Sequence, residues 1–231
     1  MSRGASKLEQ LRVTLGVHGV FVRGSLSFDE GEGPALADGT AARSVILLGN
    51  VGGSIWEPFS RWRQLSENMQ RRDPLDDWSK AIIRPIAGEL GATAYFPSDP
   101  PWQPFQQWAM RAEGLKASPL GILIHPEYGL WHGYRGALGF ADVLEDDDDA
   151  PVRGGHPCDH CVEKPCLNAC PVDAVAPAGF DVQRCRSHLR TEEGQAGCMV
   201  AGCLARNACP VGIGYRYPAA QLAFHMAALQ L

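Results

Sequence analysis

Cysteine is absent from the first 157 residues, and all eight cysteines of the chain lie between Cys158 and Cys209. A disulfide framework would be spread through a small secreted domain rather than confined to one end of a longer chain. The N-terminus also lacks an uninterrupted apolar segment followed by a cleavage site, so no secretory signal is expected. These absences favour reduced thiols in the cytoplasm, where a dense cysteine group is typical of metal binding.

Other features that the sequence lacks argue against several classes of function. No apolar run approaches the length of a membrane span, so we expect no membrane partner. The formal net charge is −5 and no long run of Lys or Arg occurs, which argues against nucleic acid as a partner. The glycine-rich segment 49–54 lacks the dinucleotide fingerprint and the P-loop lysine, and it is interpreted as a tight turn. No Ser/His/Asp set or pair of carboxylates stands out, so the catalytic residues stay unknown.

Hydrophobic periodicity predicts a mixed α+β protein. We expect helices at 7–15, 77–90, 105–113 and 219–229, and strands at 20–28, 45–48, 92–96, 120–125 and 132–140. The helix at 77–90 has Asp76 or Asp77 as its expected N-cap and a kink at Pro85. The last two strands are joined by a turn that contains proline and glycine.

The acidic segment EDDDDAPVRGG at 145–155 is the expected domain boundary. Consecutive acids repel one another when packed, so this segment is interpreted as a solvated linker. A docking site for a basic redox protein is the alternative interpretation. The sequence therefore divides into a first domain at 1–144, the linker at 145–155 and a cysteine-rich domain at 156–231.

The cysteine spacing resembles that of two-cluster ferredoxins. In those proteins three cysteines of one segment bind a [4Fe–4S] cluster, and a fourth, followed by proline, binds the other cluster. Here both Cys170 and Cys209 are followed by proline. We expect two [4Fe–4S] clusters, with zinc and a histidine ligand as alternatives. The expected ligand sets are Cys158, Cys161, Cys166 and Cys209 for one cluster, and Cys185, Cys198, Cys203 and Cys170 for the other.

The segment HPEYGLWHGYRGALGF at 125–140 is rich in aromatic residues and glycine. Glycines permit the close approach of a flat ligand, and aromatic side chains form an apolar wall. Arg135 is suited to bind a phosphate or a carboxylate. The alternative is a well-packed hairpin whose aromatic residues belong to the core.

Two motifs together carry a family resemblance over about residues 120 to 215. They are IHPEYGLW followed by RG, and the solitary cysteine of DVQRCRSHL before the last cysteine group. This arrangement resembles the epoxyqueuosine reductases and the reductive dehalogenases, and the strand-turn segment alone is similar to the cobalamin-processing decyanases. The resemblance implies a nitroreductase-like N-terminal domain that binds cobalamin, followed by a two-[4Fe–4S] ferredoxin-like module that supplies electrons to its cobalt. It also implies a corrinoid pocket along His125, Tyr128, Gly129, Trp131 and Arg135.

The function implied by this resemblance is that of an iron–sulfur oxidoreductase. Electrons would pass from two clusters to bound cobalamin, for corrinoid processing or for reduction of a small substrate. The expected partners are a corrinoid or small-molecule substrate and a redox protein as electron donor. A tRNA substrate is not favoured, because the chain is acidic and has no room for the C-terminal repeat region of the reductases. The alternatives are a non-enzymatic ferredoxin-type electron carrier and a flavin nitroreductase with attached clusters.

Overall fold

A computed structural model describes residues 3–144 and 155–230 of the chain. The chain divides into two compact units, the first of residues 1–114 with 133–153 and the second of residues 115–132 with 154–231. Residues 115–132 thus belong with the cysteine-rich unit, whereas the sequence analysis placed a boundary only at 145–155. The acidic run of that segment lies outside the described residues. No helix in the described ranges is long and apolar enough to cross a membrane.

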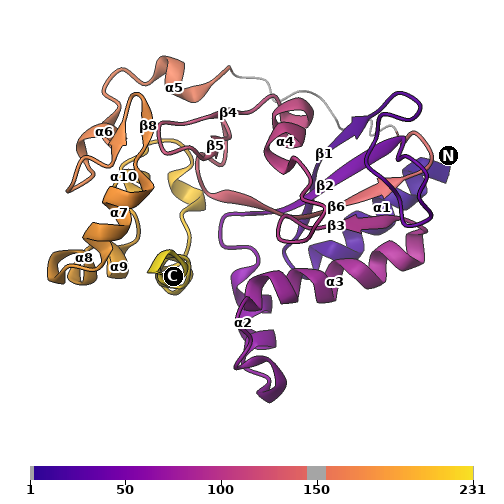
Figure 1. Cartoon of the computed structure of the whole chain (residues 1–231), viewed down its shortest axis with the longest axis horizontal. Coiled ribbons are helices and arrows are strands. Elements are labelled where there is room, and N and C mark those ends of the chain that lie inside the picture. The colour runs from indigo at the N-terminus through magenta and orange to yellow at the C-terminus, as the bar shows by residue number, and fades with distance from the viewer. Residues whose placement is uncertain (1–2, 145–154, 231) are drawn as a thin grey trace. The chain divides into compact units, whose positions relative to one another are not determined.

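The first unit is built on a four-stranded sheet with the order β1-β2-β6-β3 (Figure 1). The strands are β1 (Phe21–Ser27), β2 (Ser44–Val51), β3 (Thr93–Tyr95) and β6 (His132–Phe140). β1 runs antiparallel to β2, and β3 runs antiparallel to β6. The register of β1 shifts between Val22 and Gly24, which marks a β-bulge.

The β2 strand is the centre of the core of the first unit. Its apolar residues from Val45 to Leu48 are all 0% exposed, so side chains on both faces of the strand are covered. Burying each such side chain contributes about 1.5–3 kcal/mol. The strand reads as a continuous apolar run for this reason, without the alternation of a strand that has one solvated face.

Helices cover this sheet. They are α1 (Arg3–Gly16), α2 (Trp56–Arg63), the 3-10 turn η1 (Ser66–Asn68), α3 (Pro74–Leu90) and α4 (Phe105–Glu113). Helix α1 packs on α3, and both α1 and α4 contact β1 (Figure 1). Helix α3 has Asp73 as its N-cap residue and Pro74 at its start, so the prediction of a cap at Asp76 or Asp77 was wrong. Proline suits this first position because the amide hydrogen it lacks has no partner within the helix.

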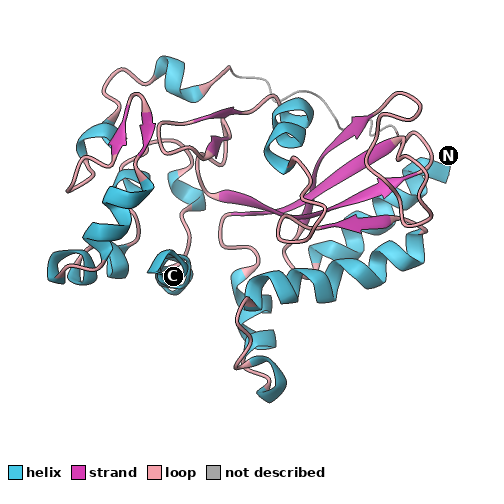
Figure 2. Ribbon diagram, in the orientation of Figure 1, coloured by secondary structure: helices cyan, strands magenta, loops and turns pink. Residues whose placement is uncertain are grey.

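The second unit consists mostly of short helices and loops (Figure 2). Its strands form two small antiparallel pairs, β4 (Lys116–Ala117) with β5 (Leu123–Ile124), and β7 (Val175–Ala176) with β8 (Gly179–Phe180). The helices are α5 (Pro157–His160), α6 (Pro165–Asn168), α7 (Val182–Leu189), α8 (Glu192–Ala196), α9 (Cys198–Ala201), α10 (Leu204–Asn207), η2 (Ile213–Tyr215), α11 (Ala219–Ala227) and η3 (Ala228–Gln230).

The expected hairpin of strands 120–125 and 132–140 does not form. β5 is only two residues long and pairs with β4, whereas β6 joins the sheet of the first unit beside β2 and β3. Gly121 and Gly129 both have positive φ, so the chain turns sharply on either side of β5. Short-range periodicity identified the apolar residues of this segment but did not identify their partners.

Candidate functional site

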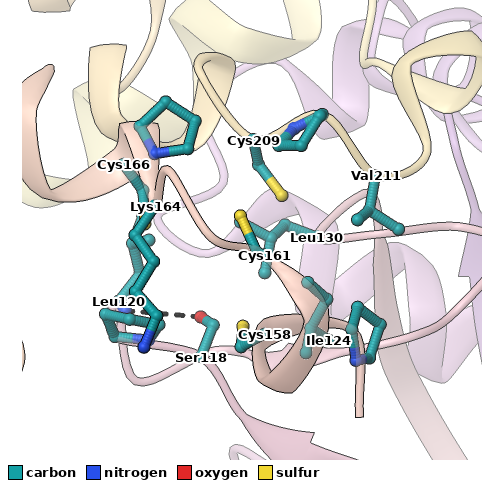
Figure 3. Close-up of a pocket in the computed structure, with 14 residues that line it drawn as sticks. Ser118, Leu120, Ile124, Leu130, Cys158, Cys161, Lys164, Cys166, Cys209 and Val211 are labelled. Atoms are coloured by element: carbon teal, nitrogen blue, oxygen red, sulfur yellow. Dashed lines mark hydrogen bonds between the residues drawn. The ribbon is translucent and has the colours of Figure 1, made fainter. Parts of the chain in front are cut away.

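The first cysteine set surrounds a small cavity in the second unit (Figure 3). The cavity holds about 30 Å³ and is lined by the thiols of Cys158, Cys161, Cys166 and Cys209. The thiol of Cys158 lies close enough to the other three for their charges to raise its pKa to about 11, with burial as the larger cause. The nearby ammonium group of Lys164 acts in the opposite direction on this pKa. The four thiols are therefore neighbours around one cavity, and burial raises the pKa of Cys158, Cys166 and Cys209.

The second cysteine set also gathers in one place. Burial, followed by the charges of Cys203, Cys170 and Cys198, raises the pKa of Cys185 to about 11. The backbone N–H of Ala174 donates a hydrogen bond to the sulfur of Cys170 at 3.2 Å. The charges that act on Cys185 thus come from the other three cysteines of its predicted set. All eight are free cysteines, so none forms a disulfide.

The prediction of two [4Fe–4S] clusters as cofactors is contradicted by the arrangement of these side chains. Over residues 3–144 and 155–230 there is no group of three or more His, Cys, Asp or Glu side chains that could hold a metal ion. A cluster needs thiolates that converge on it. Burial raises the pKa of six of the thiols, including those of Cys158 and Cys185. Over residues 115–132 and 155–230 the second unit is thus a cysteine-rich module without such a group.

The turn after β5 is held by His125. The Nδ1 atom of this side chain accepts hydrogen bonds from the backbone N–H groups of Glu127 and Tyr128, both at 3.1 Å. The imidazole ring stacks on the ring of Tyr128, with centroids 4.1 Å apart and planes inclined by 10°. Tyr128 in turn meets the ring of Tyr215 edge to face, and the hydroxyl of Tyr215 donates a hydrogen bond to the carboxylate of Glu127. His125 therefore acts as the organiser of an aromatic turn.

Gly129 permits a close contact between this turn and the segment that follows Cys209. Its φ is +58°, and a Cβ atom at this position would lie 2.0 Å from the carbonyl oxygen of Val211. Gly212 is the reciprocal case, because a Cβ atom there would lie 2.3 Å from the carbonyl carbon of Tyr128. The backbone of Val211 thus occupies the space beside Gly129 that the sequence analysis assigned to a flat ligand.

Trp131 is a core residue of the second unit. It is 0% exposed and packs edge to face on Tyr217, with centroids 5.4 Å apart. The guanidinium group of Arg206 lies 4.4 Å from the centroid of the indole ring and also donates a hydrogen bond to the carbonyl of Leu130. The aromatic residue is thereby enclosed by protein, as in the packed-core alternative. Arg135, the fifth residue of the expected pocket, lies half-buried on β6 in the first unit.

A buried polar cluster in the first unit was missed by the sequence analysis. Arg23 on β1 is 8% exposed and Glu113 at the end of α4 is 5% exposed. The Nη2 atom of Arg23 lies 2.8 Å from Oε2 of Glu113, and the hydroxyl of Tyr134 donates to Oε1 of Glu113 at 2.5 Å. Arg23 also donates to the carbonyl of Asn50 at 3.2 Å. One feature of the sequence could have indicated this cluster: Arg23 and Gly24 stand within the strand expected at 20–28, where an arginine needs a partner if it is buried.

The electrostatics of this cluster are dominated by burial. Burial raises the pKa of Glu113, and the charge of Arg23 and the hydrogen bond from Tyr134 partly oppose that shift. The pKa of Tyr134 is raised by burial and by the neighbouring carboxylate, so its hydroxyl remains protonated. The cluster can hold a proton between a tyrosine and a carboxylate, and an arginine balances the charge.

Taken together, the chain is a mixed α+β protein with a cysteine-rich second unit. No protein-family model matches it, and no curated protein matches it in sequence. Among solved structures, it is similar to the B12-trafficking protein CblC of C. elegans, a homologue of human MMACHC, with a TM-score of 0.53 and 12% identity over 98% of this chain and 96% of that one. It is also similar to epoxyqueuosine reductase from Bacillus subtilis, with a TM-score of 0.52 and 15% identity over 93% of this chain and 68% of that one. At these identities the likeness shows the fold.

Proposed function

We propose that this chain binds a corrinoid as its substrate and takes part in the reductive processing of that corrinoid. The observation that carries the proposal is the fold likeness to a B12-trafficking protein, which spans nearly the whole of both chains. The turn motif at 125–136 supports it independently, because the sequence pattern there resembles the corrinoid-binding families. Residues of this motif would then contact the bound corrinoid.

The expected pocket residues differ in what they can offer a corrinoid. Tyr128 keeps accessible surface, so within the second unit it is the candidate for direct contact. His125 would act by fixing the ring of Tyr128 through their stacked contact. Gly129 and Trp131 would act by shaping the turn, because both are already covered by protein. Val211 covers Gly129. Arg206 and Tyr217 cover Trp131.

A corrinoid supplies a cobalt centre that accepts electrons, and reductive processing needs a source for them. With the cluster prediction contradicted, the electrons would come from outside the chain, and a redox protein remains the proposed donor. Reduction of a small substrate by the bound corrinoid is the second candidate function, favoured by the likeness to a reductase. The proposal of a purely non-enzymatic ferredoxin loses its basis, since it depends on the clusters.

The test is a titration of purified protein with cob(II)alamin under anaerobic conditions, followed by desalting. We expect the cobalamin to co-elute with the protein and its absorption spectrum to change to the base-off form. Tyr128→Ala should weaken binding, whereas Arg61→Ala, at an exposed position of α2, should not. Complete separation of cobalamin from the wild-type protein on the column would refute the proposal.

A further inference from the structure

An open hollow beside α3 in the first unit has no role in the proposed corrinoid function. It encloses about 340 Å³ and is lined by Trp62, Asp77 and three cationic residues, Arg71, Lys80 and Arg84. Sites for small molecules commonly have volumes of roughly 300–1,000 Å³. The hollow is therefore large enough for a ligand rather than for one or two waters.

One face of α3 provides most of the lining. Asp77, Lys80, Ala81 and Arg84 are spaced by three, four and seven residues along this helix, so their side chains share a face. Arg71 approaches from the segment before the helix and is held there by Asp77, with 3.1 Å between Nη1 and Oδ2. Three cations from two segments of the chain thus converge on one space.

The charges in and around the hollow leave a positive excess. Asp99 is shared by two cations, since its Oδ1 lies 2.5 Å from Nζ of Lys80 and its Oδ2 lies 3.1 Å from Nη2 of Arg84. Together with the pair of Arg71 and Asp77, three positive charges face two negative ones. This local excess stands out in a chain whose formal net charge is −5. The side chain of Arg84 is 61% exposed and that of Arg71 is 42% exposed, so an anion in solution can reach both.

Trp62 adds a flat surface to this cationic site. The guanidinium group of Arg71 lies 5.4 Å from the centroid of the Trp62 ring. The guanidinium that lies over this indole offers a flat cationic surface to a planar ring, and an arginine with a lysine provides donors for phosphate oxygens. The hollow therefore has a flat aromatic surface and cationic donors within one space.

We propose that this hollow binds a small phosphorylated ligand that carries a planar ring, of the nucleoside monophosphate class. Its phosphate contacts Lys80 and Arg84, and its ring stacks on the layer that Arg71 and Trp62 form together. The site lies wholly within the first unit and requires no corrinoid.

The experiment measures binding of AMP and, separately, of inorganic phosphate to the full chain by isothermal titration calorimetry, in low salt and without cobalamin. We expect AMP to bind more tightly than phosphate. Arg84→Gln removes a charged donor and should weaken AMP binding about 10-fold or more. Trp62→Ala should weaken AMP binding while leaving phosphate binding unchanged. Arg61→Gln is the matched control, because this exposed arginine adjoins Trp62 in sequence but does not line the hollow.

Several outcomes would overturn the proposal. AMP that shows no binding at millimolar concentration would refute the site itself. Equal AMP affinity in wild type and Arg84→Gln would show that the hollow is not where the anion binds. Equal affinities for AMP and phosphate, unaffected by Trp62→Ala, would refute the ring contact. Circular dichroism of each variant separates lost binding from lost folding, and cobalamin binding, measured separately, stands or falls independently of these results.

Discussion

Replacement of Glu113 by leucine should strongly destabilise the first unit. The carboxylate of Glu113 is the buried partner of Arg23, at 2.8 Å, and it also accepts the hydroxyl hydrogen bond of Tyr134 at 2.5 Å. Glu113→Leu therefore leaves a guanidinium group with 3% side-chain exposure without its counter-ion, and leaves a buried hydroxyl without its acceptor. Both losses act in the same direction.

The expected magnitude follows from the burial of the pair. Removing one partner of a buried ion pair costs about 3–5 kcal/mol, because the remaining charge is neither solvated nor paired. A typical domain has a free energy of unfolding of about 5–15 kcal/mol. The single variant should thus lose a large fraction of its stability. The double variant Arg23→Met with Glu113→Leu should recover much of the loss, since an apolar pair of similar volume is often neutral or stabilising at such a position.

Urea unfolding followed by tryptophan fluorescence is the suitable assay. Every tryptophan except Trp131 lies in the first unit, so the signal reports chiefly on that unit. Glu57→Gln is the control, because its ion pair with Arg61 is exposed and should leave the midpoint unchanged. A Glu113→Leu midpoint equal to that of the wild type, or a double variant less stable than Glu113→Leu alone, would refute the reasoning.

Three further predictions follow from the structure. Gly129→Ala should lower the thermal midpoint of the second unit markedly, because the added Cβ atom would collide with the carbonyl of Val211. Gly121→Ala is the control: its Cβ atom would meet nothing within 4 Å, so this variant should cost only the strain of a positive φ. Equal shifts of the midpoint in the two variants would contradict this prediction. Burial raises the folded-state pKa of Glu113, so its contribution to stability is complete below the unfolded pKa of about 4.3 and is lost as the pH rises through the folded value. Tyr134→Phe removes a hydrogen bond that lowers the pKa of Glu113, so in this variant the stability contributed by Glu113 should be lost at a higher pH than in the wild type. Identical pH profiles of the urea midpoint for the wild type and Tyr134→Phe would argue against the contact. In denaturant without reductant, all eight thiols should react with Ellman's reagent, and fewer would reveal disulfides or tightly bound metal in place of free thiols.

Local sequence signals predicted much of the secondary structure. The helix at 105–113 and the strand at 132–140 have the expected bounds. Both were predictable from periodicity within one element and from residues that end an element, such as Gly114, which caps α4 with a φ of +68°. The two solved structures with a similar fold, CblC and an epoxyqueuosine reductase, belong to families that the short motif of the turn at 125–136 resembles.

Long-range contacts were beyond the sequence analysis. Arg23 and Glu113 are 90 residues apart, and nothing local shows that β1 and α4 place them together. The segment after β5 was expected to return on itself as a hairpin, but pairing with β2 and β3 directs β6 into another unit.

The cysteines show most clearly which properties could be predicted from the sequence and which depend on the tertiary structure. Their positions along the chain predict two groups of four, and the charges that act on Cys158 and Cys185 come from the other members of those groups. Whether four neighbouring thiols can act as ligands depends on the direction and ionisation of each sulfur, which the surrounding loops and their burial determine. Sequence alone thus specified elements such as the helix at 105–113 and the strand at 132–140, because their periodicity depends on neighbours in the chain. Only the tertiary structure decided the ion pair of Arg23 and Glu113, the enclosure of Trp131 and the geometry of the thiols, because each depends on atoms brought together from distant segments.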